Sequence, residues 1–146
     1  FIYSPDRTKL KGKTLRSYAS MTYAGFKSML YAKVKKDDPR VKAAVEWAGR
    51  NYTLEKNPGV GLQGHYYYIH TFAKALDAYN ENIITDKDGQ VRYWRHDVLK
   101  KMISIQKADG SWVNKVGRWQ ENQPVLCTAY AMQAMFFALS KEQNKL

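Results

Sequence analysis

Apolar residues recur at spacings of three and four over five stretches of the chain, and this periodicity predicts α-helices. In the first stretch one apolar stripe holds Leu15, Tyr18, Thr22, Phe26, Met29 and Leu30. The five predicted helices span Thr14–Lys33, Pro39–Tyr52, His65–Tyr79, Arg95–Lys107 and Pro124–Ser140. The pattern therefore predicts an all-α fold.

Local signals fix the ends of these helices and the connections between them. Asp38 is a good N-cap and Pro39 suits a first helical position, so the second helix begins there. Gly110 follows the fourth helix as a stop signal. The segment Thr53–Gly64 is rich in Gly and Pro, which predicts an ordered loop with tight turns.

The connector Ile83–Trp94 differs from the others. It carries the turn signal Asp88-Gly89 between two β-prone runs, which predicts a short β-hairpin near residues 83–94. Asp86 and Asp88 do not form an EF-hand, because the later ligands and the closing Glu are missing.

Charge alternates between the predicted helices. The first helix carries only Lys27 between Ser17 and Met29, the third is also poor in charge, and the fifth carries none from Pro124 to Leu139. The second and fourth helices carry several charged residues each. A helix that is apolar nearly all round must be buried on most sides, whereas a helix with one apolar stripe faces water. The alternation predicts inner helices one, three and five and outer helices two and four, as in an α-hairpin solenoid or toroid.

Length and termini bear on the domain organisation. The chain has 146 residues, enough for one domain with its own hydrophobic core. We treat residues 1–146 as a single domain in which residues 1–13 form an extended leader. The chain begins with neither an initiator Met nor a signal-peptide pattern, so we expect a fragment of a longer protein. Its compartment is therefore not predicted.

The net charge of +11 allows an anionic partner. A solvated, lysine-rich surface is the simpler interpretation, because the chain has no specific nucleic-acid signature. Cys127 is the only cysteine, so no internal disulfide can form. It lies in an apolar run, and we expect a small core residue rather than a nucleophile or a ligand.

The clearest landmark is Gln106–Trp112, with the sequence QKADGSW. Gly110 permits the chain to reverse after the fourth helix, and Asp109 belongs to the same turn. The Gln106 amide can bind exposed backbone groups at a helix terminus, and the face of Trp112 can cover that amide. We interpret the segment as a staple between two helices.

This segment resembles the QW motif, Gln-x-x-x-Gly-x-Trp, of the squalene–hopene and oxidosqualene cyclases in the terpenoid cyclase–prenyltransferase superfamily. Bacterial proteins described as prenyltransferase/squalene oxidase repeat proteins are similar over most of Ser17–Leu139. That similarity rests on Asp38–Val41, Val45–Trp47, Asn57–Gly61, Tyr66–Thr71 and Pro124–Ala134.

The resemblance implies an α/α-toroid fold with alternating inner and outer helices. Rings of this superfamily hold about six hairpins, whereas this chain offers about two and a half. It would form about half a ring and leave the inner layer partly uncovered. We therefore expect it to dock against the rest of its own polypeptide or another protein subunit.

The chemistry of the superfamily is not evident in this chain. The cyclases resemble one another in an acid motif, Asp-x-Asp-Asp, and the nearest segments here are Asp86-Lys87-Asp88 and Asp37-Asp38 in predicted exposed connectors. The zinc site of the protein prenyltransferases has no counterpart, since Cys127 lacks a nearby Asp. His65 and His70 are roughly 140° apart around a helix, so they do not chelate one ion together. We predict no catalytic residue, no metal site and no cofactor.

Aromatic residues on the inner helices are the remaining candidates for a site. They could line a cavity for an apolar, isoprenoid-like ligand, or simply pack the core. The candidate lining residues are Tyr18, Tyr23, Tyr67, Tyr68, His70, Phe72, Tyr130 and Phe136.

Three functions fit this sequence. The first is a non-catalytic, cyclase-like toroid segment that serves protein or ligand binding, or assembly, within a larger protein. The second is a fragment of an isoprenoid cyclase whose catalytic acid lies outside this chain. The third is binding of an anionic polymer through the lysines.

Overall fold

Residues 17–140 are described by the structure, a computed structural model, and they are mainly helical. They form α1 (Ala19–Tyr31), α2 (Pro39–Arg50), α3 (His65–Tyr79), α4 (Trp94–Ser104) and α5 (Pro124–Leu139), with a 3-10 helix, η2 (Arg118–Gln120), before α5. Strands β1 (Ile84–Thr85) and β2 (Val91–Arg92) pair antiparallel. The predicted all-α fold with one short β-hairpin is confirmed, and the predicted leader lies outside the described residues.

Helix boundaries follow local hydrogen bonds. The Asp38 carboxylate caps α2 by accepting from the backbone N–H of Arg40 at 2.9 Å, as expected for this N-cap. Helix α1 ends at Tyr31, because Lys33 adopts a φ of 59° and its N–H turns back to the Leu30 carbonyl. Helix α4 ends at Ser104, three residues before the predicted end at Lys107, because a tight turn begins there.

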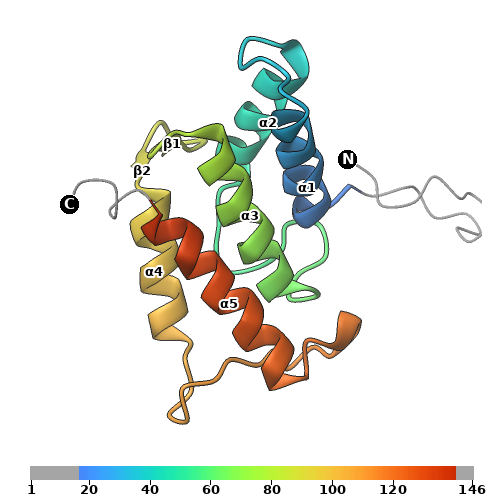
Figure 1. The fold of residues 1–146 in the computed structure, drawn as a ribbon, viewed down its shortest axis with the longest axis vertical. Helices are drawn as coiled ribbons and strands as arrows, with labels where there is room; N and C mark the ends of the chain where they lie inside the picture. The colour runs from blue at the N-terminus through green and yellow to red at the C-terminus, as the bar shows by residue number, and fades with distance from the viewer. Residues whose placement is uncertain (1–16, 141–146) are drawn as a thin grey trace, which may run out of the picture.

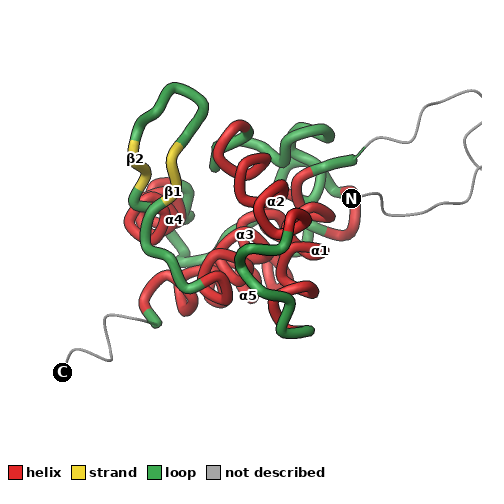
Figure 2. The backbone as a smooth tube through the Cα atoms, turned by 90° about the horizontal axis from the view of Figure 1, so that it is seen from above, coloured by secondary structure: helices red, strands yellow, loops and turns green. Residues whose placement is uncertain are grey.

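Helix α3 lies at the centre, with α1 on one side and α5 on the other (Figure 1). These three inner helices run in the same direction, whereas α4 runs the opposite way against α5. Seen from above, α2 and α4 lie apart on either side of α3 (Figure 2). The alternation of charge-poor and charge-rich helices thus matches the two layers that it predicted.

The core fills the space between the layers with aromatic side chains. Tyr23, Phe72 and Trp94 are buried, and the rings of Tyr23 and Phe72 meet edge to face with centroids 5.1 Å apart. The ion pair of Arg95 with Asp77, at 2.7 Å, joins α4 to α3 beside the C-terminal end of α5. This ion pair therefore joins α3 and α4 at the C-terminal end of α3.

Helix α5 departs from the expectation that a charge-free helix is buried on most sides. Val125, Met132 and Phe136 are 84%, 59% and 62% exposed, and with Leu139 they follow one stripe along the helix. Only the opposite face packs against α3 and α4. The described residues thus leave one face of α5 uncovered.

The landmark segment joins α4 to α5 through Trp112. Its indole N–H donates to the Met102 carbonyl in the last turn of α4, and its backbone N–H donates to the Thr128 hydroxyl on α5. Gln106 plays a smaller part than expected: its amide donates to the Gly110 carbonyl at 2.9 Å and closes an exposed turn. The helix terminus is bound by the indole instead, while the Gln106 amide binds within the turn that follows the helix.

Candidate functional site

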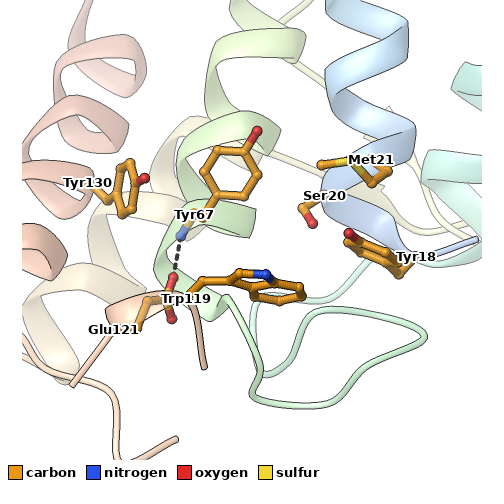
Figure 3. A pocket seen from close by; sticks show the side chains of 7 residues that line it. All are labelled: Tyr18, Ser20, Met21, Tyr67, Trp119, Glu121 and Tyr130. Atoms are coloured by element: carbon orange, nitrogen blue, oxygen red, sulfur yellow. Dashed lines mark hydrogen bonds between the residues drawn. The ribbon is translucent and has the colours of Figure 1, made fainter. Parts of the chain in front are cut away.

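A pocket of about 250 Å³ is lined by residues at the N-terminal halves of α1, α3 and α5 and by the segment 118–121. Three tyrosine rings, one indole, one carboxylate, one serine hydroxyl and one thioether surround it (Figure 3). The lining residues are Tyr18, Ser20, Met21, Tyr67, Trp119, Glu121 and Tyr130.

The loop 53–64 places the α1 side of the pocket. Asn57, which is fully buried, accepts from the backbone N–H of Ser20 and donates to the Ser20 hydroxyl, both at 3.2 Å. The carbonyl of Pro58 accepts from Ala19 at 2.9 Å. These bonds satisfy the free N–H groups that begin α1, and they fix Tyr18 and Ser20 at the pocket.

Trp119 covers one side of the pocket in a strained conformation. Trp119 and Gln120 have φ values of 56° and 64°, which residues other than glycine rarely adopt. The indole stacks with the Tyr18 ring at 6.0 Å and lies over Gly64, where a Cβ would come within 2.8 Å of it. The guanidinium carbon of Arg118 lies over the indole, 4.6 Å from the ring centroid. Backbone strain of this kind is concentrated at binding and active sites, so it indicates that the segment around Trp119 has a functional role.

Glu121 is the charged group of the pocket, and it is only 1% exposed. One carboxylate oxygen accepts from the backbone N–H of Tyr67 at 2.8 Å, and the other accepts from the Asn114 amide at 2.7 Å. Tyr67 belongs to the first turn of α3, where the helix dipole favours a negative charge. Both carboxylate oxygens thus act as hydrogen-bond acceptors.

Tyr67 and Tyr130 form another side of the pocket, with ring centroids 5.6 Å apart in an edge-to-face arrangement. His70 stacks on Tyr130 at 5.6 Å, and its buried Nδ1 has no hydrogen-bond partner among residues 17–140. Burial, followed by the charges of Lys74 and Lys27, lowers the pKa of His70 to about 4. The imidazole is therefore neutral at pH 7.

The structure divides the candidate lining residues into three groups. Tyr18, Tyr67 and Tyr130 line the pocket, and His70 lies directly behind Tyr130. Phe136 differs from the expectation, since it lies on the exposed face of α5. The residues that belong to the core instead of the pocket are Tyr23, Tyr68 and Phe72.

Sequence reasoning did not identify Trp119 and Glu121. Both belong to a connector with no helical periodicity, so no face could be assigned to them. The available signal was composition: the run 118–121 places an Arg, a Trp and a Glu immediately before a charge-free helix.

Asp86, Asp38 and Cys127 do not line the pocket. Asp86 pairs with Arg92, while the hydrogen bonds of Arg40 lower the pKa of Asp38 to about 2. The buried Cys127 thiol donates to the Glu121 carbonyl, and burial raises its pKa to about 11, so it is not a thiolate at neutral pH.

Neither a metal-ligand cluster nor a membrane-spanning helix is found in the described part of the chain. Residues 17–140 contain no cluster of three or more His, Cys, Asp or Glu that could hold a metal ion. None of the helices in this range has the length and apolar character needed to cross a membrane.

Comparisons with protein-family models, with curated proteins and with solved structures found no match to this chain.

Proposed function

We propose that this chain is a non-catalytic, ligand-binding segment of a larger α/α-toroid protein, and that the pocket between α1, α3 and α5 is its ligand site. The observation that carries the proposal is the strained Trp119 beside the buried Glu121 at one pocket. A concave, largely aromatic pocket with one oriented polar group is the usual form of a small-molecule site.

The chemistry of the pocket supports binding rather than catalysis. Its only carboxylate, that of Glu121, already accepts two N–H hydrogen bonds from the protein. Cys127 is a protonated thiol outside the pocket. The Ser20 hydroxyl binds the amide of Asn57, which is not a base that could activate it.

An isoprenoid cyclase fragment is the second candidate, favoured by the same aromatic rings, because such rings stabilise carbocations. The complete reading frame discriminates between the two proposals. An Asp-x-Asp-Asp motif outside this chain supports the cyclase and contradicts the non-catalytic assignment.

The proposal for assembly rests on α5. Its exposed stripe of Val125, Met132, Phe136 and Leu139 is apolar and carries no charge. Contiguous exposed apolar surface is typical of interaction sites. We infer that this face docks on the rest of the polypeptide or on another subunit.

A fragment screen by ¹⁹F NMR tests the ligand site. Labelling with 5-fluorotryptophan gives one signal for each of the four tryptophans, Trp47, Trp94, Trp112 and Trp119. We expect small aromatic and aliphatic fragments to shift the Trp119 signal selectively.

Two variants are matched for this screen. Trp119→Leu removes a pocket ring, and we expect it to abolish binding of the fragments that shift Trp119. Phe136→Leu changes an exposed ring outside the pocket and should leave their binding unchanged. A screen in which no fragment shifts the Trp119 signal would overturn the proposed site.

A further inference from the structure

We infer that the pocket selects an organic ammonium group, such as a trimethylammonium head, which the rings surround and Glu121 neutralises. The inference rests on the proposed function of the pocket as a ligand site and adds the chemical class of the ligand. Three observations carry it: the aromatic lining, the buried charge and the size of the pocket.

The rings come in two pairs. Tyr18 and Trp119 stack with their ring centroids 6.0 Å apart and their planes inclined by 22°. Tyr67 and Tyr130 form the second pair, and Figure 3 shows Tyr67 across the pocket from the indole. A cation held within about 6 Å of several ring centroids is attracted by the negative faces of all of them.

Glu121 supplies a negative charge to pair with the positive charge of the ammonium group. Burying a carboxylate is unfavourable unless it is paired, and Glu121 forms no ion pair with any of residues 17–140. Its two hydrogen bonds, to Tyr67 and Asn114, use about half of the acceptor sites of a carboxylate. A bound cation would complete the charge balance without competing for either N–H.

The lining excludes two other ligand classes. An anion would meet the Glu121 carboxylate, and none of the lining residues is a lysine or an arginine. A hard metal ion needs several oxygen ligands, whereas the pocket offers one carboxylate among aromatic and apolar groups. An organic cation, with its charge spread over methyl groups, suits both the rings and the carboxylate.

The size of the pocket limits the ligand. Its volume of about 250 Å³ is below the range of about 300–1,000 Å³ that is typical of sites for drug-sized molecules. The pocket therefore suits a small ammonium compound or the head of a longer one.

Calorimetric titration with choline and with its uncharged carbon analogue, 3,3-dimethylbutan-1-ol, tests the inference. The two probes have nearly the same shape, so any difference in affinity reports the charge. We expect choline to bind the unaltered protein about tenfold or more tightly than the alcohol, with a shift of the Trp119 ¹⁹F signal. This comparison needs no variant and does not depend on whether a substituted protein folds.

Glu121→Gln is the companion variant, with Glu46→Gln as its exposed control on α2. We expect Glu121→Gln to reduce the preference for choline to less than about threefold, and Glu46→Gln to leave it unchanged. If Glu121→Gln fails to fold, Tyr130→Leu replaces it, since the partly exposed Tyr130 takes part in the pocket without holding the backbone.

The outcomes separate the two proposals. Equal affinities for choline and the alcohol at Trp119 would overturn the ammonium selectivity and leave the ligand site standing. No shift at Trp119 with either probe would overturn both. Vesicles of phosphatidylcholine then identify the source of the group: co-sedimentation assigns a lipid headgroup, whereas choline binding without co-sedimentation assigns a free ammonium compound.

Discussion

A few residues in strained or costly states define the site. Trp119 and Gln120 adopt left-handed backbone angles, Glu121 buries a charge, and His70 buries a ring nitrogen without a partner among residues 17–140. Such features are retained only where the surrounding structure holds them in place. Each therefore has a measurable consequence for stability or for the geometry of the pocket.

Gly64 sets the position of the indole. Gly64→Ala would place a Cβ 2.8 Å from Trp119, so we expect a shift of the Trp119 ¹⁹F signal and a loss of stability of about 1–2 kcal/mol or more. Gly61 is the matched control, because its φ of 65° is nearly the same and a Cβ there meets nothing within 4 Å. Gly61→Ala should destabilise through backbone strain without moving Trp119. Equal shifts of the Trp119 signal in both variants would contradict this role of Gly64.

His70 makes stability depend on pH. Its folded-state pKa of about 4 is below the ordinary value of about 6.5, so the unfolded chain binds more protons between these values. The free energy of unfolding should therefore be at its full value above pH 6.5 and fall, by roughly 2–3 kcal/mol from this group, as the pH drops to 4. Denaturant unfolding at a series of pH values measures the slope.

Two histidine variants isolate that contribution. His70→Leu should flatten the slope, while the exposed His96→Leu should leave it intact. Part of the slope remains in His70→Leu, because burial also lowers the pKa of His65. An unchanged slope in His70→Leu would show that the imidazole is not held neutral.

At the scale of the elements, the connections between helices do more than link them. The loop 53–64 caps α1, Glu121 binds the first turn of α3, and Trp112 bridges α4 and α5. Each contact satisfies backbone groups that a helix end leaves free, and each places a helix relative to its neighbour. The pocket thus depends on connectors as much as on helix packing.

The stapling role belongs to Trp112, with little contribution from Gln106. Trp112→Phe leaves the Met102 carbonyl without its indole donor, and we expect a loss of about 1–3 kcal/mol in unfolding free energy. Gln106→Ala removes one exposed hydrogen bond and should destabilise by less than about 1 kcal/mol. Urea denaturation of both variants measures the difference, and a larger loss for Gln106→Ala would reverse this assignment.

At the scale of the molecule, the layers could be predicted and the site largely could not. Charge-poor and charge-rich helices alternate in sequence, and burial follows that alternation because the layers differ in their access to water. Helix α3 has the same bounds, His65–Tyr79, in the prediction and in the structure. The pattern located Tyr18, Tyr67 and Tyr130 as inner residues but could not separate them from Tyr68, because pocket and core have the same apolar signature.

The remaining site residues depend on tertiary structure. Trp119 and Glu121 lie in an aperiodic connector, and contacts with Gly64 and Tyr67, more than fifty residues away along the chain, help to hold them at the pocket. Periodicity carries no information about such contacts. The sequence predicted a partly uncovered inner layer but could not assign that exposure to α5, since a charge-free helix has the same sequence pattern whether both of its faces are covered or only one.

The α5 stripe should contribute nothing to the stability of this chain by itself. Met132→Ser changes a side chain that is 59% exposed, so we expect the free energy of unfolding to stay within about 0.5 kcal/mol. Met102→Ser, the matched change in the core, should destabilise by about 2–5 kcal/mol. Thermal denaturation distinguishes the two, and a comparable loss for Met132→Ser would show that its side chain is covered within this chain.

The central claim is that the pocket beside Trp119 and Glu121 binds a ligand through its rings and its carboxylate. A crystal structure with (2-bromoethyl)trimethylammonium tests it most directly, because the anomalous signal of bromine locates the compound. We predict one bromine site at the pocket, with the trimethylammonium group between Trp119 and Tyr67 and beside Glu121. Bromine found only elsewhere on the protein, or an empty pocket at a saturating concentration, would contradict the account.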